Sequence, residues 1–202
     1  MVDLEKAFDS VWIDGLLWKM HSLGITGNIW CLIKDFLYRR KFKINVNGFR
    51  SEEYQSYVGV PQGSVLSPIL FTIFLRDMCD NCYSINYKYA DDLTLLTFDV
   101  TLSNAILSMQ LDVDQLTLWF NKWRIKASID KTKGMVFNKS VKLTEDQNPV
   151  LFLNGQSIEF PTTIKVLGIL MDSKLSFKQQ FEQATNKASQ TLNILKKLFK
   201  RP

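Results

Sequence analysis

The chain has 202 residues, which at about 150 residues per domain corresponds to one large domain or one domain with an appendage. Hydrophobic residues make up 46% and aromatic residues 12% of the sequence, a composition that excludes disordered, collagen-like and low-complexity chains. The 25 Lys and Arg residues exceed the 20 Asp and Glu residues, giving a net charge of +5. This charge suits a polyanionic partner, but it equally suits a membrane-surface protein or an ordinary globular domain.

The three cysteines are sparse and odd in number, which argues against a disulfide-stapled secreted module and favours a reducing compartment. Cys79 and Cys82 form a lone Cys-x-x-Cys pair, and with His21 as the single histidine a zinc site is disfavoured. No run reaches the roughly 20 apolar residues of a membrane span, and the N-terminus has no signal-peptide layout. We therefore expect an intracellular protein without a membrane segment.

The first half of the chain mixes helical patterns with a hairpin signal. Asn47-Gly48 separates two alternating apolar runs, and this dipeptide suits the positive φ angles of a tight type I′ turn. Pro68 stands where a helix has its first turn. We expect, in order, helices over 13–22 and 28–38, a hairpin of strands 42–46 and 54–58, a loop over 59–63 and a buried helix over 64–79.

The second half alternates strands and helices. We expect a strand over 85–88, a turn over 89–92, a strand over 93–98, strands over 134–137, 150–153 and 164–170, and a helix over 177–199. Apolar residues stepping by three and four predict a further helix with one buried stripe, formed by Leu102, Ile106, Met109, Val113, Leu116, Phe120 and Trp123. The whole pattern predicts a two-layer fold of the α+β or α/β class, and the hairpins lead us to expect α+β.

Two adjacent carboxylates, Asp91 and Asp92, stand at the expected turn between two apolar strands. Adjacent carboxylates repel each other, and a divalent cation removes that cost. Mg²⁺ is a hard ion that takes carboxylate, carbonyl, water and phosphate oxygens. A solvated β-turn explains the same pair of residues, so the pair alone leaves both interpretations open.

Two other segments carry candidate chemistry. Asp3 follows an apolar residue near the start of the chain, and either Asp3 or Asp9 is also a candidate cap for a helix beginning near Ala7. The glycine-rich segment 59–64 ends the hairpin and opens an apolar helix, so its backbone can approach a substrate closely. Within it, Gln62 offers both a donor and an acceptor.

Taken together and in this order, these segments resemble the motifs of the reverse transcriptases, and among them those of non-LTR retrotransposons. The similarity rests on several ordered matches, namely Val2-Asp3-Leu4-Glu5-Lys6-Ala7-Phe8-Asp9-Ser10-Val11 for motif A, Gly59-Val60-Pro61-Gln62-Gly63-Ser64-Val65-Leu66-Ser67-Pro68 for motif B, Tyr89-Ala90-Asp91-Asp92 for motif C, Ile129-Asp130-Lys131-Thr132-Lys133 for motif D and Val166-Leu167-Gly168-Ile169 for motif E. Five ordered motifs are a highly specific signal.

The resemblance implies a polymerase palm, an antiparallel sheet backed by helices, with Asp3 on a strand facing the 89–92 hairpin. It implies transfer of deoxynucleotides to a primer 3′-hydroxyl with two Mg²⁺ ions, or Mn²⁺ in their place. Asp3 and Asp91 would bridge both ions, with the Leu4 carbonyl as an added ligand and Asp92 as a secondary carboxylate. Tyr89 would support the primer terminus.

The resemblance also assigns nucleotide-binding residues. Phe8 falls where the family places its steric gate, a ring that leaves no room for a 2′-hydroxyl, although an ordinary core aromatic remains the alternative. Gln62 and Gly63 would line the nucleotide and template side. Lys131 would lie near the triphosphate as a candidate acid for pyrophosphate, with Lys133 as the competitor and solvated charge as the alternative for both.

Contacts to nucleic acid are expected to involve mainly the backbone. The resemblance implies that Leu167 and Gly168 form a hairpin against the primer. Arg39, Arg40 and Lys41 are candidate phosphate contacts, each of which would make binding salt-dependent, although solvated charge explains them equally well. Further basic and aromatic residues accompany these two regions, namely Lys34, Tyr38, Phe42 and Lys43 before the first hairpin and Lys187, Lys196, Lys197, Lys200 and Arg201 near the end.

The domain boundaries follow from the motifs. We expect a palm over residues 1–172, without the fingers that precede motif A in the family, and the start of a thumb over 173–202. The expected function is RNA-directed DNA polymerase, with RNA template, DNA primer and deoxynucleotides as partners. The alternative is an inactive fragment or a co-opted nucleic-acid-binding remnant. A polymerase using ribonucleotides is disfavoured by Phe8 and by alanine before the paired aspartates.

Overall fold

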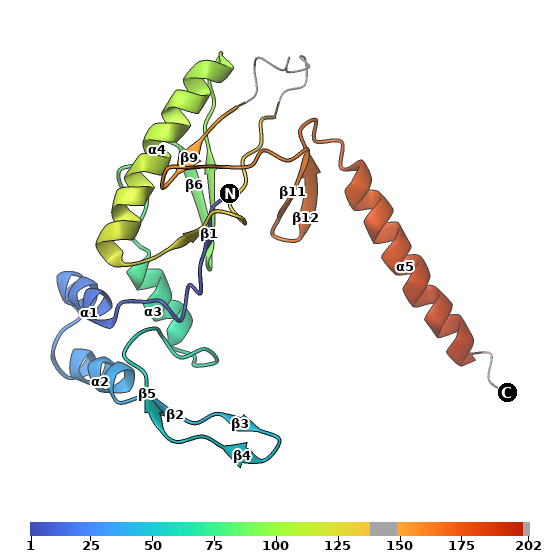
Figure 1. Cartoon of the computed structure of the whole chain (residues 1–202). Coiled ribbons are helices and arrows are strands. Elements are labelled where there is room, and N and C mark those ends of the chain that lie inside the picture. The colour runs from blue at the N-terminus through green and yellow to red at the C-terminus, as the bar shows by residue number, and fades with distance from the viewer. Residues whose placement is uncertain (138–148, 200–202) are drawn as a thin grey trace.

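A computed structural model of the chain describes residues 1–137 and 149–199. These residues form five helices and short antiparallel strand pairs, which confirms the α+β class (Figure 1). The elements are β1 (Asp3–Leu4), α1 (Ile13–Ser22), α2 (Gly27–Tyr38), β2 (Lys41–Phe42), β3 (Asn45–Val46), β4 (Phe49–Arg50), β5 (Tyr54–Gln55), α3 (Ser67–Phe74), β6 (Ile85–Tyr89), β7 (Asp92–Leu96), α4 (Leu102–Trp123), β8 (Ala127–Ser128), β9 (Phe152–Leu153), β10 (Gln156–Ser157), β11 (Thr163–Val166), β12 (Ile169–Asp172) and α5 (Lys178–Phe199).

A four-stranded arrangement at the centre of the molecule places the start of the chain beside residues 127–128. β6 pairs with β7 and β1 pairs with β8, both antiparallel. An antiparallel bridge between Val2 and Leu93 joins the two pairs, with Val2 N donating to Leu93 O at 2.7 Å. The resulting order is β6-β7-β1-β8. Neither β8 nor its pairing with β1 was expected, because a two-residue strand carries no periodic signal.

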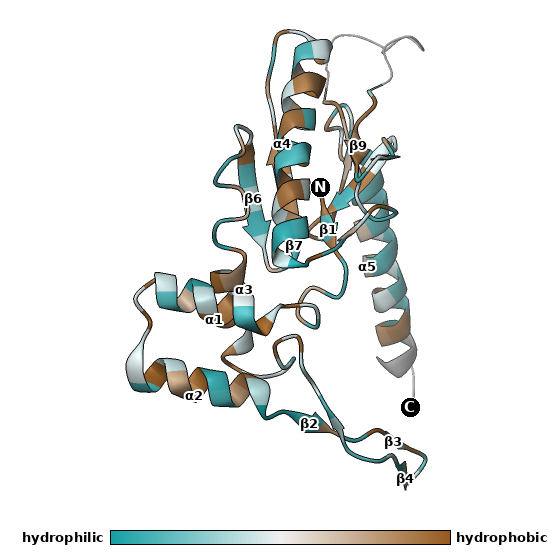
Figure 2. Cartoon of the chain, turned by 60° about the vertical axis from the view of Figure 1, so that its left-hand side comes forward, coloured by the Kyte–Doolittle hydropathy of each residue, from teal (hydrophilic) through white to brown (hydrophobic). Residues whose placement is uncertain are grey.

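α4 covers this arrangement with the predicted apolar stripe, and apolar and polar segments alternate along the helix (Figure 2). Val113, Leu116, Phe120 and Trp123 are buried, as expected. The helix begins after Thr101, whose hydroxyl accepts a hydrogen bond from Asn104 N at 3.2 Å, a regular N-cap. The buried apolar side chains form one core shared by α1, α3, α4 and the central strands.

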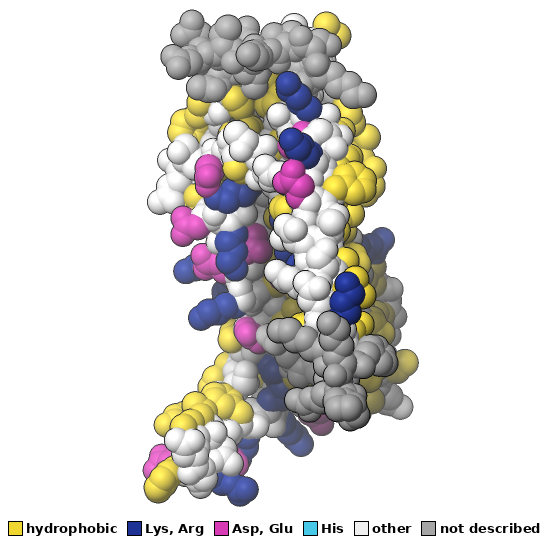
Figure 3. Space-filling view, turned by 90° about the vertical axis from the view of Figure 1, so that its right-hand side faces the viewer, with side chains coloured by type: hydrophobic (Ala, Val, Ile, Leu, Met, Phe, Trp, Pro, Cys, Tyr) yellow, Lys and Arg dark blue, Asp and Glu magenta, His cyan; other side chains and the backbone are white. Residues whose placement is uncertain are grey.

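α1 and α2 lie where the sequence predicts helices, at the lower left of Figure 1, and α1 packs against both α2 and α3. The expected hairpin is present, but β2 pairs with β5 and β3 with β4, so the strand expected over 54–58 ends at Gln55. Asn47 and Gly48 form its turn with φ values of +51° and +86°. The hairpin projects from the molecule with an exposed apolar surface, which Figure 3 shows at the lower end of the chain, and its exposed apolar residues include Phe42, Ile44, Val46, Phe49 and Tyr54.

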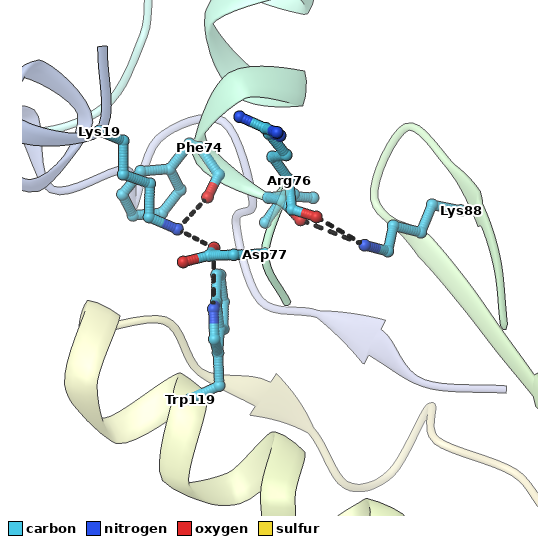
Figure 4. Close-up of polar contacts among 7 residues, drawn as sticks. Lys19, Phe74, Arg76, Asp77, Lys88 and Trp119 are labelled. Atoms are coloured by element: carbon cyan, nitrogen blue, oxygen red, sulfur yellow. Dashed lines mark hydrogen bonds and ion pairs between the residues drawn. The ribbon is translucent and has the colours of Figure 1, made fainter. Parts of the chain in front are cut away.

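The helix expected over 64–79 is shorter than predicted. α3 spans Ser67–Phe74, with Pro68 in its first turn. Two lysines bind carbonyl groups at and just beyond its C-terminal end (Figure 4). Lys19 Nζ donates to Phe74 O at 2.6 Å, and Lys88 Nζ donates to Arg76 O at 3.1 Å. Carbonyls at a helix C-terminus lack intrahelical partners, and cationic side chains satisfy them there.

Three further expectations need correction. The predicted strand over 164–170 is a hairpin of β11 and β12, because Leu167 and Gly168 adopt φ values of +47° and +89° and reverse the chain. The predicted strand over 134–137 is not a strand: pairing is limited to its start, where Gly134 N donates to Glu159 O at 2.9 Å. The turn expected over 89–92 is tighter, because Tyr89 and Asp92 are already paired strand residues.

The C-terminal helix α5 begins one residue later than expected and stands away from the rest of the chain, at the right of Figure 1. It contacts the molecule through β12. Its apolar residues Phe181, Leu192, Ile194 and Leu195 are exposed. Within the two described ranges, none of the helices combines the length and apolar character needed to span a bilayer.

Candidate active site

Asp3 lies on β1 between two neighbours that come from distant parts of the sequence. Its backbone pairs with Ser128 of β8, and the preceding residue bridges to β7. The Oδ2 atom of Asp3 is buried and makes no hydrogen bond. Lys131 Nζ lies 3.4 Å from this oxygen, so the two groups form an ion pair without hydrogen-bond geometry. Asp3 therefore presents a carboxylate oxygen with unused acceptor capacity.

Asp91 and Asp92 lie at the tip of the β6–β7 hairpin. Ala90 and Asp91 form the two-residue turn, with Ala90 at φ +52°, and Asp92 begins β7 opposite Tyr89. Burial raises the pKa of the Asp92 carboxyl, and the nearby charges of Asp91 and Asp3 raise it further. Asp91 and Asp3 therefore lie close enough for their charges to act on Asp92.

A cleft of about 580 Å³ joins the three segments that the sequence singles out. It combines carboxylates, an aromatic ring, an amide and a lysine on walls contributed by β1, the loop before α3, the β6–β7 turn and the segment after β8. Among its lining residues are Asp3, Leu4, Phe8, Gln62, Gly63, Asp91 and Lys131. Asp3, Gln62, Asp91 and Lys131, from motifs A, B, C and D, therefore share one cleft, whereas Asp92 is not among its lining residues.

Phe8 lies in the wall of this cleft. Its ring stacks on Phe71 of α3, with ring centroids 4.5 Å apart and an angle of 21° between the planes. The ring is half-buried, so one part packs on the core while the other lines the cleft. The ring thus belongs both to the packing around Phe71 and to the cleft lining, a position compatible with either sequence interpretation.

Gln62 faces Phe8 from the loop that precedes α3. Its side-chain nitrogen donates to both carboxylate oxygens of Asp9, each at 3.1 Å. The sequence suggested Asp9 as a cap for a helix near Ala7, and this is wrong: the chain forms turns there, and the first α-helix begins at Ile13. The pairing of Asp9 with Gln62 had no local sequence signal.

The two candidate lysines occupy different surroundings. Lys131 lines the cleft beside Asp3 and remains largely exposed. Lys133 forms an ion pair with Glu159 and lines a different cavity. That second cavity measures about 450 Å³ and lies against α4 and β7, with mostly apolar walls that include neither Asp3 nor Asp91.

The residues expected to contact the primer do not line the cleft itself. Tyr89 is 67% exposed at the end of β6, next to the turn that carries Asp91. Leu167 and Gly168 form the exposed turn of the β11–β12 hairpin, with Leu167 57% exposed. Tyr89 thus lies on one hairpin, and Leu167 and Gly168 lie together on another.

The basic residues near the first hairpin are mostly engaged within the chain. Lys41 pairs with Glu53 at 2.6 Å, and Arg39 lies 3.7 Å from Asp35. Arg40 binds carbonyl groups instead of standing free in solvent. In the same region, Lys43 also approaches Glu53, and Lys34 lies over the Trp30 ring. Near the C-terminus, Lys187 and Lys196 lie on α5. The Lys197 side chain, Lys200 and Arg201 lie outside the described residues.

The donor set of the cleft suits a hard divalent cation. In the described part of the chain, no three His, Cys, Asp or Glu side chains are close enough to form a complete metal site. The cleft nevertheless combines the unbonded Oδ2 of Asp3, the Asp91 carboxylate and a lining contribution from Leu4. These are oxygen ligands of the kind that Mg²⁺ takes together with water and substrate phosphate.

Comparison with known proteins agrees with this geometry. A family model described as reverse transcriptase (RNA-dependent DNA polymerase) matches residues 1–171. The chain is 30% identical over 208 residues to a probable RNA-directed DNA polymerase from transposon BS of Drosophila melanogaster, covering 99% of this chain and 23% of that protein. It is 32% identical over 186 residues to the RNA-directed DNA polymerase from mobile element jockey of Drosophila funebris, covering 88% of this chain and 20% of that protein.

A more distant relative shares part of the same region. The chain is 29% identical over 119 residues to a retrovirus-related Pol polyprotein from type-1 retrotransposable element R2 of Popillia japonica. That alignment covers 52% of this chain and 20% of the polyprotein. The chain thus spans about a fifth of the length of the curated relatives it matches.

Proposed function

The chain belongs to the reverse transcriptase (RNA-dependent DNA polymerase) family, and from this premise we propose that it is the catalytic core of an RNA-directed DNA polymerase of a retrotransposon. The observation that carries the proposal is the shared cleft of Asp3 and Asp91, which are far apart in the sequence. Nucleotidyl transfer with two metal ions needs carboxylate ligands close together, beside a space large enough for a nucleotide. The second large cavity is mostly apolar and contains neither carboxylate, so it suits this chemistry less well.

The proposed fold is a polymerase palm over residues 1–172, followed by the start of a thumb over 173–202. The strand order β6-β7-β1-β8 with α4 against it supports a palm, because an antiparallel sheet with one helical face is the expected architecture. The separate position of α5, which contacts the chain through β12, supports a boundary near residue 172.

Asp3 and Asp91 are the proposed ligands of two Mg²⁺ ions, with the Leu4 carbonyl and Asp92 as additional oxygen donors. When bound, such ions activate the primer 3′-hydroxyl and neutralise the charge of the triphosphate. The chain itself supplies the geometry: pairing of β1 with β8 and bridging to β7 fix Asp3 beside the β6–β7 turn. The buried, unbonded Oδ2 of Asp3 supports its role as a ligand.

The remaining cleft residues act on the nucleotide in this proposal. Phe8 excludes a 2′-hydroxyl, and its stacking on Phe71 holds the ring in position. Gln62 and Gly63 line the same cleft and contact the nucleotide and template side. Lys131 is the favoured proton donor to pyrophosphate, because it lines the cleft whereas Lys133 is paired with Glu159.

The proposed partners are an RNA template, a DNA primer and deoxynucleoside triphosphates, and the proposed setting is inside the cell. Tyr89, Leu167 and Gly168 are exposed on hairpins, a position that suits contact with the primer. Of the basic residues near the first hairpin, Arg39 and Lys41 retain exposed side chains, which suits contact with phosphate.

Primer extension on an RNA template tests the proposal. The wild-type protein and the double variant Asp91→Asn, Asp92→Asn are compared in the presence of Mg²⁺ with labelled primer. We expect extension by the wild type and loss of extension in the double variant, with Asp35→Asn on α2 as the control that retains activity. Equal signals from wild type and double variant contradict the proposal. No extension by either protein, with retained binding of the template duplex, identifies a nucleic-acid-binding remnant.

A further inference from the structure

Arg40 donates hydrogen bonds to backbone carbonyl groups of the chain itself. A residue that served only to contact phosphate would not need these bonds. Its Nη2 atom donates to Val58 O at 2.8 Å and to Gly59 O at 2.6 Å, and its Nε donates to Leu37 O at the end of α2 at 3.1 Å. The residue is half-buried. A guanidinium presents several donors in a planar fork, and here that fork joins a helix end to the loop before α3.

The same loop is bonded on its other side to the turn that carries Phe8. Gly59 N donates to Val11 O and Val60 N donates to Phe8 O, each at 2.8 Å. Gly59 has φ +79°, and a Cβ atom there would lie 2.6 Å from the Asp9 carbonyl oxygen. The loop is therefore held between Arg40 and the Phe8 turn, in close backbone contact that only glycine permits.

The hydrogen bonds continue to the nucleotide side of the cleft. Two residues beyond Val60, Gln62 donates to the carboxylate of Asp9, the residue next to Phe8. Phe8 and Gln62 line the same cleft. Arg40 therefore acts at one end of a continuous bonded chain whose other end carries both of these side chains.

We propose that Arg40 is a positioning residue that fixes the loop 58–62 against the Phe8 turn and so maintains the selection of the nucleotide sugar. This inference rests on the polymerase function proposed above. It also replaces the sequence expectation that Arg40 contacts nucleic-acid phosphate, because its Nε and Nη2 donors already serve carbonyl groups.

Arg40→Lys and Arg40→Ala distinguish the two roles. A lysine keeps the charge that a phosphate contact needs, but its single ammonium cannot reproduce a fork that reaches Leu37, Val58 and Gly59. In the positioning role both variants lose function to a similar degree. In the phosphate role Arg40→Lys resembles the wild type.

The first measurement is hydrogen–deuterium exchange of the Gly59 and Val60 amides, which requires no polymerase activity. We expect exchange about 10-fold faster in both Arg40 variants, because local opening of the loop becomes easier. Arg39→Ala is the matched control, since its side chain is exposed and pairs with Asp35, and its exchange should equal that of the wild type. Unchanged exchange in both Arg40 variants overturns the proposal.

The second measurement separates sugar selection from nucleic-acid affinity. We expect the preference for deoxynucleotides over ribonucleotides to fall about 10-fold in both Arg40 variants, a loss within the range that one pocket contact controls. The slope of binding affinity against salt should stay unchanged in Arg40→Ala, whereas loss of a phosphate contact reduces it by roughly 0.7–0.9. A reduced slope that Arg40→Lys restores overturns the proposal.

The two measurements also separate failure of this inference from failure of the proposed function. If the wild-type protein extends no primer, the polymerase proposal fails. The exchange rates of the Gly59 and Val60 amides then still test whether Arg40 holds the loop in place. If the wild type extends primers and the Arg40 variants keep its sugar preference, the proposed role of Arg40 in sugar selection is contradicted. The proposed polymerase function is then unaffected.

Discussion

Phe8 occupies a position that suits both of the roles that sequence reasoning treats as alternatives, a core ring and a gate. The ring stacks on Phe71 and also lines the cleft beside Asp3 and Gln62. A ring supported in this way by the core resists displacement by a larger substrate, because a close-packed interior is hard to compress. Its packing therefore supports its proposed role in sugar selection.

Replacement of Phe8 tests that role. We predict that Phe8→Ala increases incorporation of ribonucleotides about 10-fold or more, because the ring no longer occupies the space of a 2′-hydroxyl. The measurement is primer extension with competing deoxynucleotides and ribonucleotides. Phe71→Leu, which removes the stacking partner and keeps the gate, is the control with a smaller effect. Unchanged sugar preference in Phe8→Ala contradicts the assignment.

Lys131 and Lys133 form a second comparison at the level of single residues. The sequence left the choice between them open because the two lysines are only two positions apart. The structure separates them, since Lys131 lies beside Asp3 in the cleft and Lys133 is paired with Glu159.

We predict that Lys131→Ala lowers the rate of nucleotide addition about 100-fold or more, the effect of losing one general acid. Lys133→Ala should have a smaller effect on that rate and should mainly remove the ion pair with Glu159. Single-turnover kinetics measure both rates. A larger rate loss in Lys133→Ala contradicts the choice of Lys131.

At the scale of elements, the hairpin that carries Asp91 depends on a buried carboxylate of α4. Asp112 is fully buried, and its two oxygens accept hydrogen bonds from Tyr83 N and Ser84 N, each at 2.8 Å. These bonds fix the chain directly before β6. The apolar stripe predicted α4 correctly, but a buried aspartate within it has no periodic signal and was not foreseen.

Asp112→Asn replaces one of these acceptors by an amide donor. We predict a loss of about 2 kcal/mol in the free energy of unfolding, because one buried N–H group loses its partner. Asp114→Asn, at an exposed position of the same helix, is the control and should change stability by less than about 0.5 kcal/mol. Urea denaturation measures both. Equal stability of Asp112→Asn and wild type contradicts this role.

The same scale shows where turn chemistry succeeds in prediction. Asn47-Gly48 and Asn154-Gly155 mark turns that the structure contains, because both residue types tolerate positive φ. Leu167-Gly168 reverses the chain as well, but leucine rarely adopts positive φ, so the sequence predicted one strand across it. The primer-contact expectation for this turn came from the family resemblance and not from local pattern.

At the scale of the whole molecule, a buried lysine joins three helices (Figure 4). Lys19 of α1 pairs with Asp77 after α3 and lies 3.7 Å from the ring centroid of Trp123 on α4. Trp119 Nε1 donates to Asp77 Oδ1 at 3.1 Å. Burial lowers the pKa of Lys19 to about 8, although the hydrogen bond and charge of Asp77 act in the opposite direction.

This pKa gives a pH dependence with a definite sign. An unfolded chain keeps the ordinary lysine pKa of 10.5, so between about pH 8 and 10.5 it binds more protons than the folded chain. The Lys19 contribution to the free energy of unfolding therefore rises with pH across that window and is constant below it.

Asp77→Asn removes the carboxylate and leaves the buried ammonium without its counter-charge. We predict a loss of about 3 kcal/mol in the free energy of unfolding at pH 7. The loss should be smaller at pH 9, because Lys19 is then mostly neutral in the folded protein. Urea denaturation at the two pH values measures the difference, and an equal loss at both contradicts the assigned pKa.

How much of the molecule the sequence predicted depends on how local each signal is. The long helices and Asn-Gly turns follow from nearby residues, and the resemblance identified Asp3, Asp91 and Phe8 before their proximity was known. The pairing of β1 with β8 and the bonds of Arg40 join residues that no local pattern relates. These contacts assemble the cleft, and they required the three-dimensional structure.

The central claim is that Asp3, held beside the β6–β7 turn, takes part in metal-dependent nucleotide addition. Its most direct test is the single-turnover rate of the first deoxynucleotide addition to a primer on an RNA template with Mg²⁺, for wild type and Asp3→Asn. We predict addition by the wild type and a fall of at least about 100-fold in Asp3→Asn, comparable to loss of a preorganised electrostatic group. Equal rates for the two proteins would contradict the claim.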